Sequence, residues 1–483
     1  MKDTQTVHMV SLGCPKNRVD SEVMLGHMLG AGYTPVDDPE GADVVVVNTC
    51  GFIDAAKEES IDVIIEMEDL KKAGDCGKLV VTGCLSQRYA PELAKEMPEV
   101  DHFLGTGNFE EIARVLEGRI ERPRDSTGST LLPIVQEHPR LKGSNKLEPF
   151  RFSEEVDDRS IYIPDPAFHI SSESPRISTQ PHYTRYLKVS EGCSNTCSFC
   201  IIPKLRGPQR SRTIDDIVRE AHALRGSGTV EFNLVAQDLC AFGQDRKPRE
   251  NLAGLFRALN EVGRQTEGPM WIRAMYAYPR GLTSEVMEVM ADSEHILPYL
   301  DMPLQHISDS MLQRMRRGKG GESTLELLRK LRATIPGLTL RTTFITGLPG
   351  ESEDDFKELC DVVEEIRFEQ MGVFVYSPEA GTPAAEMDGQ IPRGVAEARR
   401  DRLMEIQQRI SADQQQAMIG KRVEVLVEGV SDETELLLKG RHQGQAPDID
   451  GITYINDGKA SPGDLVTIEV EDSMNYDLVG GIV

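Results

Sequence analysis

The chain lacks several features that mark common classes of protein. No window of eighteen consecutive apolar residues occurs among its 483 residues, and the first residues, MKDTQTVHMVSLGC, hold neither the basic segment nor the apolar segment of a signal peptide. We therefore expect a cytoplasmic protein without a membrane span. Positive charge is also scarce, because 54 Lys and Arg stand against 79 Asp and Glu. The net charge of −25 argues against a protein whose main task is to grip nucleic acid, and it favours a basic partner.

The most cysteine-rich stretch of the chain also lacks the paired ligand pattern of a common zinc site. SEGCSNTCSFCIIP places Cys193, Cys197 and Cys200 within eight positions, and no second C-x2-C or His pair follows. In a reducing compartment, clustered cysteines favour metal over disulfides. Three thiolates would leave one iron of a four-iron cluster without a protein ligand. Zinc with a distant fourth ligand and chance burial are the alternatives.

The first 120 residues alternate apolar runs with helical patterns. The runs VHMVSLGC, ADVVVVNTC and KLVVTGC are predicted to be buried strands, and they end at Cys14, Cys50 and Cys84. Strands that alternate with helices predict a parallel sheet, so the three thiols are expected along its carboxyl edge, where open α/β folds bind ligands. Taken singly, each of these cysteines is more simply explained as a buried structural residue.

The pattern predicts an α/β protein of several domains. Residues 1–120 are expected to form the parallel-sheet domain, and residues 121–181, rich in Pro, Ser and charge, to form a linker or insertion. Six strand–helix units in 182–412 are too few for an eight-stranded barrel, so they predict a partial (βα)6 barrel followed by a connecting helix. Short alternating segments in 413–483 predict a small antiparallel β-barrel.

The second cysteine group resembles a known family. C-x3-C-x2-C after the first strand of a βα barrel, with an aromatic residue (Phe199) before the third cysteine, is similar to the signature of radical S-adenosylmethionine (SAM) enzymes. The resemblance implies a [4Fe-4S] cluster on Cys193, Cys197 and Cys200 whose open iron binds SAM. Reductive cleavage of that SAM would release a 5′-deoxyadenosyl radical.

With the first cysteine group added, the whole chain resembles the methylthiotransferases. This likeness implies a second [4Fe-4S] cluster on Cys14, Cys50 and Cys84, and a TRAM domain at the carboxyl end. The segments SLGCPKNRVDSE, CIIPKLRG and DMPLQHISDSMLQRMRRG resemble the branch that modifies the β-carbon of an aspartate in ribosomal protein S12. From residue 417 on, five Lys and Arg face thirteen Asp and Glu, which favours a basic protein substrate over tRNA.

The resemblance also implies a mechanism. One SAM methylates a sulfur on the second cluster, another yields the radical, and a flavodoxin- or ferredoxin-type protein supplies electrons. We name no catalytic protein base, because the β-carbon of the aspartate carries no acidic proton. Obligatory nucleic acid is not expected. The rival hypotheses are a tRNA adenosine methylthiotransferase and, in another class, a non-catalytic iron–sulfur electron carrier or zinc-stabilised adaptor.

Other positions have two interpretations each. Gln237 and Asp238 follow the second barrel strand and are candidates to bind SAM, although Asp238 is as readily a helix cap. Gly347 is either a close approach to adenine or a plain turn. Three further residues are interpreted as structural, and the basic run RMRRGKGG as a solvated helix end. The three structural residues are Cys76, Cys240 and Cys360.

Overall fold

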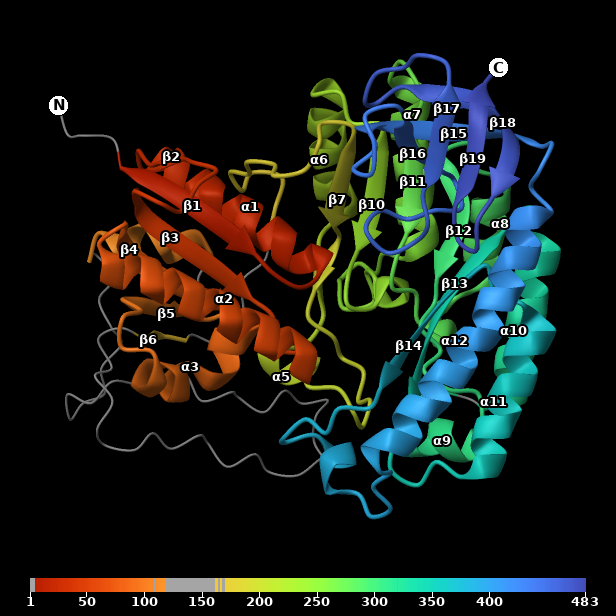
Figure 1. Cartoon of the computed structure of the whole chain (residues 1–483), viewed down its shortest axis with the longest axis horizontal. Helices are drawn as coiled ribbons and strands as arrows, with labels where there is room; N and C mark the ends of the chain where they lie inside the picture. Colours follow the sequence, from red (N-terminus) through yellow and green to blue (C-terminus); the bar gives the residue numbers. More distant parts are fainter. Residues whose placement is uncertain (1–4, 108, 119–160, 164–165, 167–169, 319) are drawn as a thin grey trace. The chain divides into compact units, whose positions relative to one another are not determined.

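A computed structural model describes residues 5–107, 109–118, 161–163, 166, 170–318 and 320–483 (Figure 1). The chain divides into two compact units. The first contains residues up to Thr179 together with Glu191–Ser194 and Ile201–Pro208, and the second contains the remainder, from Gln180 to Val483. In the described part of the chain, no helix has the length and apolar character needed to cross a membrane.

The first unit is built on a parallel sheet of six strands in the order β2-β1-β3-β4-β5-β6 (red through orange in Figure 1, with β6 yellow). Its central strands are runs of valine and other apolar residues, which suit a sheet buried on both faces. The three predicted strands are all present. The strands are β1 (Thr6–Ser11), β2 (Thr34–Pro35), β3 (Ala42–Thr49), β4 (Cys76–Gly83), β5 (His102–Leu104) and β6 (Ile161–Tyr162).

Three strands of this sheet, β2, β5 and β6, were not predicted as strands. β5 and β6 extend the sheet beyond β4, and β6 lies within the segment expected to be a linker. Three helices of the unit follow β1, β3 and β4, and a short one follows β5. They are α1 (Pro15–Gly30), α2 (Asp54–Ala73), α3 (Cys84–Glu96) and α4 (Ile112–Leu116), with the 3-10 turn η1 (Phe109–Glu111) before the last.

The second unit contains the predicted partial barrel. Six parallel strands lie in the order β14-β13-β12-β11-β10-β7, and the sheet does not close. Apolar side chains from the sheet and its helices form one large core that includes Phe232, Phe256 and Phe344. The strands are β7 (Thr184–Lys188), β10 (Glu231–Val235), β11 (Trp271–Ala274), β12 (Ile296–Asp301), β13 (Thr339–Thr346) and β14 (Gln370–Val375).

Helices follow the barrel strands, and short elements lie between them. The short strands β8 (Ser190–Glu191) and β9 (Arg210–Ser211) flank the cysteine loop in sequence, and α5 (Ile202–Arg206) lies between them. The helices of the second unit are α6 (Ile214–Gly226), α7 (Leu252–Gln265), α8 (Ser284–Asp292), α9 (Asp309–Arg314), α10 (Gly321–Thr334), α11 (Glu353–Ile366) and α12 (Arg393–Gln416). The 3-10 turns are η3 (Leu239–Ala241), η4 (Pro279–Gly281) and η5 (Pro383–Glu386).

The predicted connecting helix, α12, packs on the barrel. The Gln407 side chain, 1% exposed, donates a hydrogen bond of 2.9 Å to the carbonyl of Phe368 before β14. At the amino-terminal part of the helix, Arg399 pairs with buried Glu351 at 2.8 Å. The helix is therefore part of the barrel wall.

The carboxyl-terminal segment forms the predicted small barrel, closed by five strands in the order β15-β16-β17-β19-β18. The antiparallel prediction holds for four pairings, but β17 and β19 pair in parallel. The closing strand β19 was not predicted. The strands are β15 (Arg422–Val430), β16 (Leu438–His442), β17 (Thr453–Asp457), β18 (Leu465–Ser473) and β19 (Leu478–Ile482).

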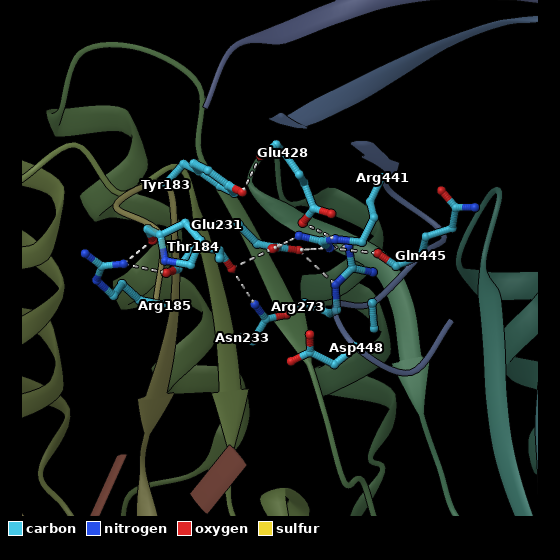
Figure 2. A network of polar contacts seen from close by, with 12 residues as sticks. Tyr183, Thr184, Arg185, Glu231, Asn233, Arg273, Glu428, Arg441, Gln445 and Asp448 are labelled. Carbon is cyan, nitrogen blue, oxygen red and sulfur yellow. Dashed lines mark hydrogen bonds and ion pairs between the residues drawn. The ribbon is translucent and has the colours of Figure 1, made fainter. Parts of the chain in front are cut away.

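A buried ionic network joins this small barrel to the amino-terminal ends of the large barrel's strands (Figure 2). Glu231, at the start of β10, is fully buried between Arg441 of β16 and Arg273 of β11, at 2.6 and 3.0 Å. Burial alone would raise the pKa of Glu231, but the two guanidinium charges and their hydrogen bonds outweigh it and lower the pKa to about 2. The carboxylate is therefore charged at neutral pH.

Removal of one partner of this network should be costly. We expect Arg441→Leu to lower the free energy of unfolding of the second unit by about 3–5 kcal/mol, since it leaves the Glu231 charge buried with half of its compensation. Arg422→Leu, an exposed arginine of the same barrel, is the matched control and should change it by less than about 0.5 kcal/mol. Urea unfolding of both variants checks the expectation, and equal losses would contradict it.

Candidate functional site

The three amino-terminal cysteines lie along one edge of the first sheet, as predicted. β1, β3 and β4 are parallel neighbours, and Cys14, Cys50 and Cys84 follow them within three residues of their ends. Two glycines allow the loops to approach. A side-chain carbon on Gly13 would lie 3.0 Å from the Cys50 sulfur, and one on Gly51 would lie 2.9 Å from the Cys84 carbonyl. The sequence thus brings the three thiols together.

The surroundings of Cys50 and Cys84 favour neutral thiols. Burial raises the pKa of Cys50 to about 12, and negative charge on Cys14 and Cys84 adds to the rise. Burial also raises the pKa of Cys84, and the Arg206 charge opposes it. Because a cysteine ligates metal as its thiolate, loading of this site must displace protons.

Cys193, the first cysteine of the second group, belongs to the first unit. Its backbone N–H donates a 3.0 Å hydrogen bond to the Gly207 carbonyl. Gly192 before it has a φ of +73°, and a side-chain carbon there would lie 2.2 Å from the Pro208 carbonyl oxygen. A glycine is required at this position because the backbone passes too closely for any side chain.

Cys197 and Cys200 belong to the second unit, where an apolar cluster supports them. Phe199 is 9% exposed and packs with Met311, Met315 and other apolar side chains. Between the two cysteines, the Ser198 N–H and hydroxyl donate to the Met315 and Arg314 carbonyls at 3.0 and 2.7 Å. The aromatic residue of the motif therefore anchors the cysteine loop, and its contact with SAM stays a prediction.

Asp238 performs the capping role that was the alternative interpretation. Its carboxylate accepts a hydrogen bond from the Ala241 N–H at 3.3 Å, at the start of η3. It also accepts one from the Asn195 side chain at 2.7 Å, and Asn195 lies in the cysteine loop. Burial raises the pKa of Asp238 against the effect of these hydrogen bonds. Asp238 thus orients the loop, while SAM contacts by Asp238 and the half-buried Gln237 stay predictions.

Gly347 has a packing reason of its own. Its φ is +81°, and a side-chain carbon there would lie 2.3 Å from the Ala396 side chain of α12. Its N–H donates to the Glu351 carboxylate at 2.6 Å. These contacts account for glycine in the GLPG turn without a ligand, and the predicted approach to adenine remains a prediction.

One residue of the basic run does more than end a helix. Arg317 lies 3.6 Å from the Cys197 sulfur, donates to the Pro303 carbonyl, and stacks 4.3 Å above the ring of Tyr278. The sequence does not indicate this role, because nothing in RMRRGKGG separates Arg317 from its solvated neighbours. Arg317 and Tyr278 also line a cavity of about 340 Å³, but no cysteine lines it.

The cysteines fit cluster ligation better than a single ion. All nine are free thiols. Among the described residues, no three His, Cys, Asp or Glu side chains gather closely enough to hold one metal ion. A four-iron cluster has a different requirement, because each cysteine binds a different iron and the sulfurs are spread apart. The lack of a compact ligand set among the described residues is therefore compatible with cluster ligation, and the number of clusters stays a prediction.

Three family models match consecutive parts of the chain. Residues 6–105 match the Uncharacterized protein family UPF0004, residues 187–363 the Radical SAM superfamily and residues 419–483 the TRAM domain. The fold and the cysteine loop thus define a radical SAM enzyme, which uses an iron–sulfur cluster and SAM. Relatives that share about half of their residues with this chain identify the family within that class. The chain belongs to the family of ribosomal protein uS12 methylthiotransferases, RimO.

The family assignment rests on matches over nearly the full length. The RimO of Anaeromyxobacter sp. strain Fw109-5 is 52% identical over 99% of this chain and 93% of its own, and that of Myxococcus xanthus is 50% identical over 99% and 92%. Among solved structures, TsrM from Kitasatospora setae, a radical SAM methyltransferase with cobalamin and [4Fe-4S] cluster bound, has a TM-score of 0.54 at 15% identity, over 79% of this chain and 77% of that one. OxsB, a cobalamin-dependent SAM radical enzyme, has 0.51 at 14%, over 85% and 56%. These two likenesses show the fold alone.

Proposed function

We propose that this chain attaches a methylthio group to the β-carbon of an aspartate in ribosomal protein uS12. The observation that carries the proposal is the presence of the first cysteine group, Cys14, Cys50 and Cys84, at the carboxyl edge of the first sheet, in addition to the cysteines of the radical SAM loop. A radical enzyme needs one cluster for SAM cleavage, so a second site of the same composition calls for another task. The relatives, which are ribosomal protein uS12 methylthiotransferases, suggest that this task is to supply the sulfur of the methylthio group.

Each cysteine group has its own role in this proposal. When bound, the two [4Fe-4S] clusters and SAM supply the 5′-deoxyadenosyl radical and the sulfur for insertion. We assign one cluster to Cys193, Cys197 and Cys200, with SAM held near Phe199, Gln237, Asp238 and Gly347. The apolar cluster around Phe199 keeps water from the loop, and Asp238 holds Asn195 in place. No described residue is assigned as a proton-transferring base.

The partners follow from charge and chemistry. The TRAM barrel carries more acidic than basic residues, and we propose that its exposed acidic residues contact the basic ribosomal protein in the cytoplasm. Some of these acidic side chains make contacts inside the protein instead. Asp450 accepts a 2.7 Å hydrogen bond from Tyr299, and Glu428 pairs with Arg441, so both serve the contact with the large barrel. A flavodoxin- or ferredoxin-type protein is proposed as the electron donor.

Reconstituted enzyme tests the proposal directly. We expect about eight irons per chain after anaerobic reconstitution, 5′-deoxyadenosine on addition of SAM and dithionite, and a methylthio group on purified uS12. Unfractionated tRNA in the same reaction should remain unmodified. If tRNA gains the group and uS12 does not, the substrate is wrong. Zinc in place of iron would contradict the enzyme class.

A further inference from the structure

A buried arginine contacts the first cysteine group. Arg206 is the last residue of α5, six positions after Cys200, and is only 2% exposed. Its Nε donates a hydrogen bond to the Cys84 sulfur at 3.4 Å. The chain around it is fixed in the same unit, because the Leu205 carbonyl accepts a 2.7 Å hydrogen bond from the Thr106 hydroxyl. The segment that leaves the radical SAM loop thus places a cation beside Cys84.

The other donors of this guanidinium bind polar groups of the first unit. Nη1 donates to Asp20 at 2.9 Å and to Glu191 at 3.1 Å, and Nη2 donates to the Asn17 side-chain oxygen. Asp20 and Asn17 are fully buried on α1, the helix that begins directly after Cys14. These partners fix the plane of the guanidinium, so its Nε–H is held toward the sulfur.

The contact between Arg206 and the Cys84 sulfur affects the local charge around the first cysteine group. Asp20 and Glu191 contribute two negative charges against the one positive charge of Arg206, and three cysteine thiolates add three more. Hydrogen bonds to cysteine sulfur and local net charge are the main factors that set the reduction potential of an iron–sulfur cluster. A buried cation that touches a ligand sulfur stabilises the more negative, reduced state.

We propose that Arg206 is a positioning residue for the cluster held by Cys14, Cys50 and Cys84. Arg206 orients this cluster through the Cys84 sulfur and raises the reduction potential of the cluster. The proposal rests on the proposed function, since it needs a cluster at this site. The CIIPKLRG segment, which begins at Cys200, would then also serve the first cysteine group, because it contains Arg206.

The test isolates this cluster in full-length chain that carries Cys193→Ala, Cys197→Ala and Cys200→Ala. In that background we expect about four irons per chain, and an EPR-monitored redox titration gives the midpoint potential. Arg206→Gln should lower the midpoint so that the ratio of reduced to oxidised cluster at a fixed potential falls at least tenfold. Arg206→Lys, which keeps the charge, should recover part of the shift. An unshifted midpoint in Arg206→Gln overturns the proposal.

Two further variants keep the result interpretable. Arg212 is buried and paired with Asp216 and Glu220 in the second unit without a contact to cysteine sulfur, so Arg212→Gln should leave the midpoint unchanged. If Arg206→Gln does not fold, Asp20→Asn carries the test, because it leaves the Arg206 charge less compensated and should raise the midpoint. A fixed midpoint there overturns the proposal. Absence of iron from the background chain would contradict the proposed function instead.

Discussion

Cys197→Ala is expected to abolish 5′-deoxyadenosine formation. Cys197 is a free thiol and one of the three that we propose to hold the cluster that binds SAM, and loss of one such ligand would leave two irons without protein thiolate. Iron should fall from about eight to about four per chain, and deoxyadenosine should fall below detection in the presence of SAM and dithionite. Iron analysis and chromatography of the reaction measure both quantities.

Cys240→Ala is the matched control for that variant. Cys240 lies in η3, is 4% exposed, and belongs to the large apolar core of the barrel. Its replacement removes one buried sulfur, at a cost of about 1 kcal/mol in stability, while iron content and deoxyadenosine should be retained. Equal loss of deoxyadenosine in both variants would contradict the assignment of Cys197.

Cys50→Ala is expected to separate radical formation from sulfur insertion. The variant should keep about four irons and should still form deoxyadenosine, because the other three cysteines are intact. It should form no methylthiolated uS12, since the site that we propose to supply sulfur is lost. Mass analysis of uS12 and chromatography of deoxyadenosine in the same reaction distinguish the two activities.

Cys76→Ala provides the control within the same sheet. Cys76 begins β4, at the edge opposite to Cys84, and its thiol donates to the Lys78 carbonyl at 3.4 Å. We expect product formation and iron content to be unaffected. Methylthiolated product from Cys50→Ala would refute the proposed division of labour between the two cysteine groups.

The positions of the cysteines could be predicted from the sequence because parallel strands impose a simple rule. Valine-rich strands ending at Cys50 and Cys84 must leave the sheet at the same edge, and β1 with Cys14 adds a third member. The open barrel was predictable for a similar reason, from six repeated strand–helix units. Local patterns of apolar residues determine both features.

Contacts between distant segments were not predictable. Arg206 meets Asn17 and Asp20 across more than 180 positions, and Arg441 meets Glu231 across 210. No local pattern distinguishes these arginines from the solvated arginines on helix surfaces. Strand β19 was missed because its sequence, LVGGI, contains two glycines that weaken the strand signal, although Gly480 is needed where the Glu469 carbonyl approaches closely.

The mass of ribosomal protein uS12 from cells with and without this gene tests the central claim most directly. The account predicts a methylthio group on one aspartate of uS12 in cells that carry the gene, its absence after deletion, and its return with the intact gene but not with Cys50→Ala. The methylthiolated nucleosides of tRNA should be the same in all of these strains. Retention of the group on uS12 after deletion, with loss of a methylthio group from tRNA, would contradict the account.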